Sequence, residues 1–116
     1  MRQYKNLIVW QKSVQFSIKL YKITSKFPDK EKFGLISQIC RAGVSLPSNI
    51  AEGSKRSTKK DFRSFLYIAH GSGAELETQL YIAKELSYIE EKEYTVLIQE
   101  LDEIMKILAV FIKKLS

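Results

Sequence analysis

Apolar residues at alternating spacings of three and four run without a break through the last quarter of this sequence. Such spacing places every member on one face of an α-helix, because the helix has 3.6 residues per turn. A β-strand would need strict alternation of apolar and polar residues, and no segment of the chain has that pattern. Residues 90–115 are therefore expected to form a helix with one continuous buried face. That face comprises Tyr94, Leu97, Leu101, Ile104, Leu108, Phe111 and Leu115.

Three earlier segments have the same periodicity. We expect helices over residues 7–26, 32–53 and 58–86, each with an apolar face. The 116 residues include 5 glycines and 2 prolines, which are few for the turns of a β-rich domain. The sequence predicts a single all-α domain over residues 1–116, an antiparallel up-down four-helix bundle. The expected core residues of these segments are Val9, Phe16, Leu20, Ile23, Phe27, Leu35, Ile39, Ala42, Leu46, Ile50, Phe62, Phe65, Leu66, Ala69, Gly73, Leu76, Leu80 and Ala83.

Pro47 lies in the second expected helix. Proline has no amide hydrogen to donate to the carbonyl of Gly43, and its ring crowds that carbonyl, so we expect a bend. Thr58 and Asp61 have the spacing of a capping box, in which the hydroxyl and the carboxylate both close the start of the third helix.

Charge is distributed unevenly along the chain. The net charge is +6. Residues 1–63 contain 14 Lys and Arg against 4 Asp and Glu, a net charge of +10. Residues 64–116 contain 5 against 9, a net charge of −4. Such polarity favours an anionic partner on one side, or contact between the basic and acidic halves of two copies.

The residues that most enzymes and metal sites require are few in this sequence. One cysteine, Cys40, and one histidine, His70, cannot supply a zinc site or an internal disulfide. No glycine-rich phosphate loop or nucleophile motif is present. No apolar run is long enough to span a membrane, and the first residues lack the apolar core of a secretory signal. We therefore expect a cytoplasmic, non-enzymatic protein without a metal or a cofactor.

A cluster of cations follows the second expected helix. Five lie within nine residues, and three lysines on the first expected helix add to them. Such groups can bind phosphates in a salt-dependent manner that tolerates any base sequence. The alternative is a solubilising surface without a ligand. The candidate nucleic-acid-binding residues are Lys55, Arg56, Lys59, Lys60, Arg63, Lys12, Lys19 and Lys22.

Polar residues at helical spacing form a stripe on the second and third expected helices. Arg41 is expected to meet Glu52 or Glu75, with amides and hydroxyls filling the remaining hydrogen bonds. A buried network of this kind fixes register and partner more than it adds stability. A solvated face and a ligand site are the alternatives. The candidate assembly network comprises Gln38, Arg41, Ser45, Asn49, Glu52, Ser72, Glu75 and Gln79.

Short stretches spread over residues 6–89 resemble one known family. It comprises bacterial four-helix-bundle proteins encoded within intervening sequences of large-subunit ribosomal RNA genes, also labelled ribosomal protein S23-like. Ser87 departs from the family pattern, which often has glycine before a Tyr-Ile pair. The matching stretches are Asn6-Leu7, Val9-Trp10-Gln11-Lys12, Phe27-Pro28, Ser37-Gln38, Arg41-Ala42, Ser45, Pro47-Ser48-Asn49-Ile50-Ala51-Glu52-Gly53, Phe65-Leu66, Gly71-Ser72 and Glu75-Leu76.

This resemblance implies a small antiparallel bundle that assembles as a pentameric ring. It also implies a relation to the accessory protein of diversity-generating retroelements, a basic pentamer that binds a reverse transcriptase and nucleic acid. No catalytic residues carry over. The sequence and the resemblance together predict a homo-oligomeric protein that binds RNA or DNA through a basic surface. The alternative is a protein-binding assembly scaffold with no direct nucleic-acid role.

Overall fold

Four long helices form most of the chain in the computed structural model, which describes residues 3–116. They are α1 (Ile8–Thr24), α2 (Leu35–Ser54), α3 (Lys59–Glu85) and α4 (Glu91–Lys114). Two short 3-10 turns, η1 (Tyr4–Asn6) and η2 (Asp29–Glu31), precede α1 and α2. No strand occurs among residues 3–116. The predicted all-α class is confirmed.

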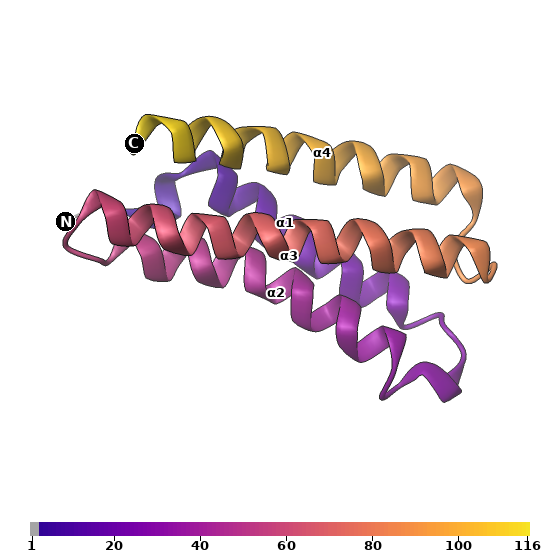
Figure 1. Cartoon of the computed structure of the whole chain (residues 1–116). Coiled ribbons are helices and arrows are strands. Elements are labelled where there is room, and N and C mark those ends of the chain that lie inside the picture. Colours follow the sequence, from indigo (N-terminus) through magenta and orange to yellow (C-terminus); the bar gives the residue numbers. More distant parts are fainter. Residues whose placement is uncertain (1–2) are drawn as a thin grey trace.

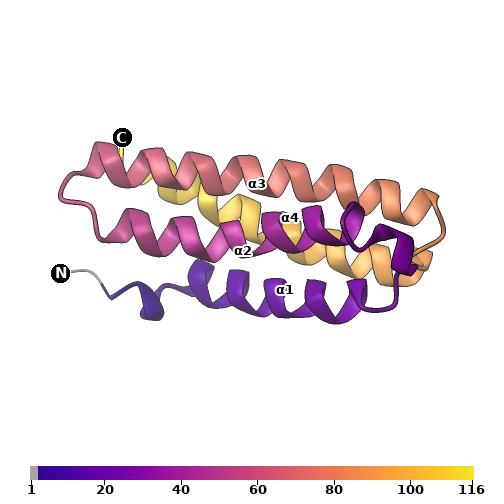
Figure 2. The same cartoon turned by 90° about the horizontal axis from the view of Figure 1, so that it is seen from below.

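Successive helices run in opposite directions and pack side by side (Figures 1 and 2). The helix α1 also packs against α4, which closes the bundle, whereas the diagonal pairs make no close approach within residues 3–116. The α2–α3 contact is the most extensive and the α1–α4 contact the least. The predicted antiparallel up-down bundle is confirmed. It measures 43 by 24 by 20 Å.

The interior contains the apolar faces expected from the sequence, with three exceptions. Phe65, Tyr94 and Phe111 are half-buried, because each lies at the border of its helix face. Burial of the other side chains is the main favourable contribution to folding, about 25 cal/mol for each Å² of apolar surface removed from water. The most completely enclosed apolar side chains are Leu20, Ile39, Leu46, Ile50, Leu66, Leu76, Leu80, Leu97, Leu101, Ile104 and Leu108.

The second helix begins at Leu35, three residues later than the sequence pattern indicates. Gly34 has a non-helical backbone, with φ −109° and ψ −111°, and Glu31 in η2 caps the helix that follows, because its Oε1 accepts a hydrogen bond from the Leu35 amide at 3.1 Å. The Tyr88 hydroxyl donates to the other carboxylate oxygen at 3.0 Å. One carboxylate therefore caps a helix and joins the α1–α2 and α3–α4 connections.

The helix α2 continues without interruption through Pro47, which is buried. At the start of α3, the Thr58 hydroxyl accepts the Asp61 amide at 3.1 Å, which is the hydroxyl half of the predicted capping box. At the end of α3, Ser87 has a φ of 64°. The Tyr88 amide donates to the Ala83 carbonyl and the Ser87 amide to that of Lys84, both at 2.9 Å, which is a Schellman motif.

Candidate nucleic-acid interface

The turn η1, the α2–α3 connection and the end of α4 lie at the same end of the bundle (Figures 1 and 2). The antiparallel topology therefore brings cations from η1, the α2–α3 connection, the start of α3 and the last turn of α4 to one place. We call this region the basic end. Its cations are Lys5, Lys55, Arg56, Lys59, Lys60, Arg63, Lys113 and Lys114.

The sequence reasoning found the five cations that are close in sequence and missed Lys5, Lys113 and Lys114. These three are remote along the chain from the α2–α3 connection. The up-down topology was the signal that could have found them, because it places residues near 5, 57 and 114 at the same end of the bundle.

Three cations of the basic end are held by contacts within the chain. Arg63 Nη1 donates to the Leu115 carbonyl at 2.7 Å and so satisfies a free carbonyl at the end of α4. Arg56 forms a 2.6 Å ion pair with Glu52 and lies 4.6 Å from the centroid of the Phe65 ring. The Lys55 ammonium lies 5.5 Å from the Tyr4 ring centroid.

The other five cations of the basic end are exposed and have no ion-pair partner within residues 3–116. The nearby acidic residues in sequence are Glu52, which already pairs with Arg56, and Asp61. Positive charge is therefore concentrated here without matching negative charge. The opposite end mixes Asp29, Glu31, Glu85, Glu90, Glu91 and Glu93 with Lys26, Lys30, Lys32, Lys84 and Lys92.

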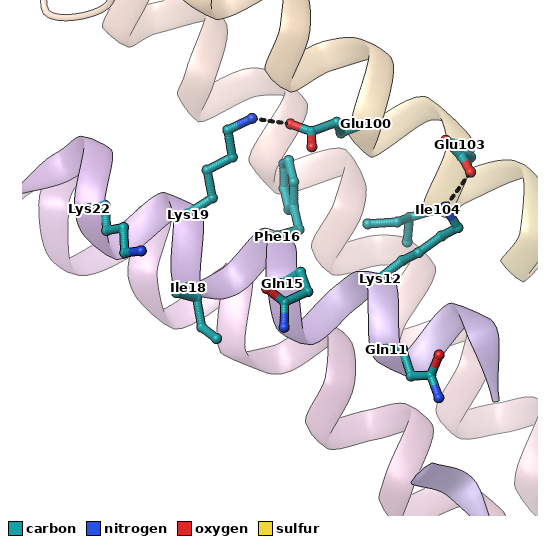
Figure 3. Close-up of a pocket in the computed structure, with 10 residues that line it drawn as sticks. All are labelled: Gln11, Lys12, Gln15, Phe16, Ile18, Lys19, Lys22, Glu100, Glu103 and Ile104. Carbon is teal, nitrogen blue, oxygen red and sulfur yellow. Dashed lines mark hydrogen bonds and ion pairs between the residues drawn. The ribbon is translucent and has the colours of Figure 1, made fainter. Parts of the chain in front are cut away.

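The predicted lysines of the first helix lie apart from this region, along the seam between α1 and α4 (Figure 3). Lys12 pairs with Glu103 and Lys19 with Glu100, both at 2.6 Å, whereas Lys22 pairs with neither (Figure 3). A cavity of about 530 Å³ lies between these helices. Because the glutamates of α4 neutralise two of the three lysines, this surface is less suited to phosphate than the basic end.

Three uncharged members of the expected polar network, Ser45, Asn49 and Ser72, are joined by hydrogen bonds within the chain. The Asn49 amide donates to Ser45 Oγ at 2.8 Å, and the Ser45 and Ser72 hydroxyls are 2.8 Å apart. Ser72 donates to the Ile68 carbonyl at 3.2 Å. If Ser45 donates to Ser72, every hydroxyl in this chain of hydrogen bonds both donates and accepts. The hydrogen bonds link α2 to α3.

The charged residues of the expected network do not pair with each other within the chain. Glu52 lies three turns from Arg41 on α2, about 16 Å away along the axis, and pairs instead with Arg56 one turn further on. Arg41 and Glu75 are exposed and have no partner within residues 3–116.

Arg41 and Glu75 both line a recess of about 420 Å³ between α2 and α3. Gln38 and Gln79 line it too, and Gln79 Oε1 is buried without a hydrogen-bond partner in the described structure. We call this the α2–α3 recess. It offers a cation, an anion and an unsatisfied acceptor to a molecule outside the chain.

The model of the 23S rRNA-intervening sequence protein family matches residues 5–110. The chain belongs to this family. A crystal structure of a protein of unknown function from the S23 ribosomal protein family of Bacteroides thetaiotaomicron superimposes with a TM-score of 0.83 at 29% sequence identity. The match covers 91% of this chain and 99% of the Bacteroides chain. No curated protein matches the chain.

Membership of the 23S rRNA-intervening sequence protein family confirms the resemblance seen in the sequence. The Ser87 departure from the family pattern falls at the positive φ that ends α3, where glycine is the residue without steric cost. Within residues 3–116 of this family member, no group of three or more His, Cys, Asp or Glu residues gathers closely enough to hold a metal ion. No helix in that part of the chain is long and apolar enough to cross a membrane.

Proposed function

We propose that this member of the 23S rRNA-intervening sequence protein family is a non-enzymatic protein that binds RNA or DNA through its basic end. The observation that supports the proposal is the convergence of eight cations from separate parts of the sequence at one end of the bundle. Five of them have no ion-pair partner in the described chain, so that a phosphate backbone would not have to compete with a carboxylate for them.

Phosphate contacts of this kind release counterions from the nucleic acid. The affinity then falls steeply as salt rises, with a slope of about −0.9 for each phosphate neutralised on duplex DNA and about −0.7 on single strands. The five cations without an ion-pair partner are all lysines. Lysine acts as a compact point charge without the planar fork of arginine. The proposed binding is therefore weakly dependent on base sequence.

The proposal includes self-association, with the pentamer of the family resemblance as the proposed form. The unpaired Arg41 and Glu75 in the α2–α3 recess support it, because each would find its counterpart on another copy. Exposed apolar side chains on both helices of this face, Val44 on α2 and Ile68 and Ile82 on α3, also favour a covered surface. Several basic ends in one assembly would bind one nucleic acid more tightly than a single copy.

A binding titration with labelled RNA and DNA across a salt series tests the nucleic-acid proposal. Reversing two charges of the basic end, Lys59→Glu with Lys60→Glu, is expected to weaken binding at least ten-fold and to lower the salt slope by about two. Glutamate in the first turn of α3 is compatible with the helix dipole, so the fold should persist. Helix content and the mass of the assembly should stay unchanged.

The matched control reverses two exposed lysines at the opposite end, Lys30→Glu with Lys32→Glu. It changes the net charge by the same amount and should retain most of the affinity. An equal loss in both variants would mean that net charge acts without a defined site. Negligible affinity of the wild type at low salt, with assembly intact, would reject the nucleic-acid proposal and favour the alternative, a protein-binding assembly scaffold with no direct nucleic-acid role.

A further inference from the structure

An apolar slot lies on the outer side of α4, near the end of that helix. It has a volume of about 460 Å³ and is lined by Lys106, Ile107, Val110, Phe111 and Lys114. Val110 is 54% exposed, and no polar side chain apart from the two lysines takes part in the lining. The slot is therefore a small apolar surface, open to solvent, between two cations.

The geometry of the slot follows from helical spacing. Lys106, Val110 and Lys114 recur every four residues and so form a stripe about 12 Å long, with an apolar residue between two cations. Ile107 and Phe111 form the adjacent stripe. The Phe111 ring is fixed from behind by the Phe62 ring, at a centroid distance of 5.1 Å and an interplanar angle of 69°.

The electrostatic surroundings of the slot are mainly positive toward the end of α4. Residues 104–116 contain no acidic side chain, whereas the exposed Asp102 lies one turn before Lys106 on the same stripe, and Glu103 is paired with Lys12. The slot also adjoins the basic end, because Lys114 is in the last turn of α4 and Arg63 donates to the carbonyl of the next residue, Leu115. The apolar slot and the cations of the basic end therefore form one surface.

We propose that this slot holds an unstacked base of single-stranded RNA or DNA while Lys106 and Lys114 bind the flanking phosphates. The inference rests on the proposed function and names its substrate class. A single strand offers flat apolar rings between regularly spaced anions, which matches an apolar slot between two lysines. A duplex keeps its bases stacked inside and offers phosphates alone, so that it leaves the slot empty. Bases of single strands stack on aromatic side chains whatever their sequence, and Phe111 is the aromatic residue of the slot.

The test compares three oligonucleotides of one length and phosphate count per strand: a single strand, its duplex, and a strand without bases. Each is titrated at fixed salt against the wild type and against Val110→Asn. The wild type should bind the single strand at least five-fold more tightly than the strand without bases. Val110→Asn should lose most of that advantage, so that its affinity for the single strand falls about five-fold. The salt slope should stay unchanged, because the substitution removes no charge.

The matched control is Val96→Asn, a change at a 43% exposed valine in the first half of the same helix. It should bind all three probes like the wild type. Equal affinity of the wild type for strands with and without bases, or an equal effect of both valine variants, would overturn the slot proposal. A change in the mass of the assembly caused by Val110→Asn would also overturn it, because a second copy would then cover the slot.

The same titration separates this proposal from the broader one. If the basic-end variant Lys59→Glu with Lys60→Glu loses affinity for all probes while Val110→Asn loses none, the basic end binds nucleic acid and the slot does not. If the wild type binds none of the three probes, the proposed function itself is rejected, and the slot proposal with it.

Discussion

Ser87 has a backbone conformation that residues with a Cβ atom avoid. Its φ of 64° places the Cβ close to the following carbonyl, at a cost of about 1–2 kcal/mol that glycine does not incur. The Schellman hydrogen bonds to Ala83 and Lys84 hold the residue there despite this cost. The backbone at the end of α3 is therefore strained at Ser87.

Replacing Ser87 by glycine is expected to stabilise the protein. The relief of strain exceeds the added chain entropy of glycine, and the net gain should be about 0.5–1 kcal/mol. The midpoint of thermal unfolding, followed by circular dichroism, should rise by about 2–5 °C. Ser57→Gly is the control, since Ser57 has no positive φ, and it should give no gain. Equal shifts in the two variants would contradict the explanation.

Glu31 makes stability depend on pH through one carboxylate. Hydrogen bonds from the Leu35 amide and the Tyr88 hydroxyl favour the charged form and lower the pKa of Glu31, and Lys30 adds to this effect. The contribution of the charged Glu31 to the free energy of unfolding is complete at pH values above the normal pKa of a glutamate. It is lost as pH falls through the lowered pKa of the folded protein.

The stability difference between the wild type and Glu31→Gln should therefore shrink as the pH is reduced from 6 to below the normal glutamate pKa of about 4.3. Thermal unfolding of both proteins at each pH measures it. Tyr88→Phe should reproduce part of the difference, because it removes the hydroxyl that donates to Glu31. A difference that stays constant over this range would show that Glu31 acts without its charge.

Helix α3 contacts α4 closely at Gly73, where a side chain rather than a neighbouring backbone occupies the space. A Cβ atom at this position would overlap the sulfur of Met105. Gly71, one half-turn earlier, faces open space, with no atom within 4 Å of such a Cβ. The two glycines therefore differ in their role although they are two residues apart.

Alanine at these two positions should have different effects on stability. Gly71→Ala should stabilise the helix by up to about 1 kcal/mol, the difference in helix propensity. Gly73→Ala gains the same propensity but displaces the flexible end of the half-buried Met105 side chain, so that its net effect on stability should be about 1 kcal/mol less favourable than that of Gly71→Ala. Chemical denaturation of the two variants measures both. Similar stability of the two would refute the packing role of Gly73.

Sequence periodicity was sufficient to predict the helices but not which side chains pair between them. The apolar faces of α1 and α4 followed from the spacing of residues such as Phe16 and Ile104, because burial requires only that side chains share a face. The pairs Lys12–Glu103 and Lys19–Glu100 could not be predicted, since they depend on how far each helix is rotated and shifted against the other. The same limit applied to Arg41. The cations of α4 that complete the basic end could instead have been placed there from the predicted up-down topology.

The whole molecule has an excess of positive charge at one end and unpaired charges of both signs in the α2–α3 recess. Glu75→Ala should leave the helix content intact and reduce self-association. It removes the carboxylate that is proposed to pair with Arg41 of a second copy. Sedimentation or light scattering over a protein dilution series measures the change. Asp102→Ala removes an equal charge from an exposed site on α4 and serves as the control. Unchanged assembly in the Glu75 variant would reject this role.

The uneven packing around the bundle has a consequence for its dynamics. The α2–α3 contact is the most extensive, and hydroxyl and amide hydrogen bonds reinforce it, whereas α1 and α4 meet along a thin seam with two exposed ion pairs, each contributing about 0–1 kcal/mol. Partial opening would therefore begin by separation of α1 from α4, with the α2–α3 hairpin still closed. Backbone amides of α2 and α3 should exchange with solvent deuterium most slowly, and those of α4 should exchange earlier. The slot lies on α4, so the proposed base-binding surface belongs to the part of the molecule that opens first.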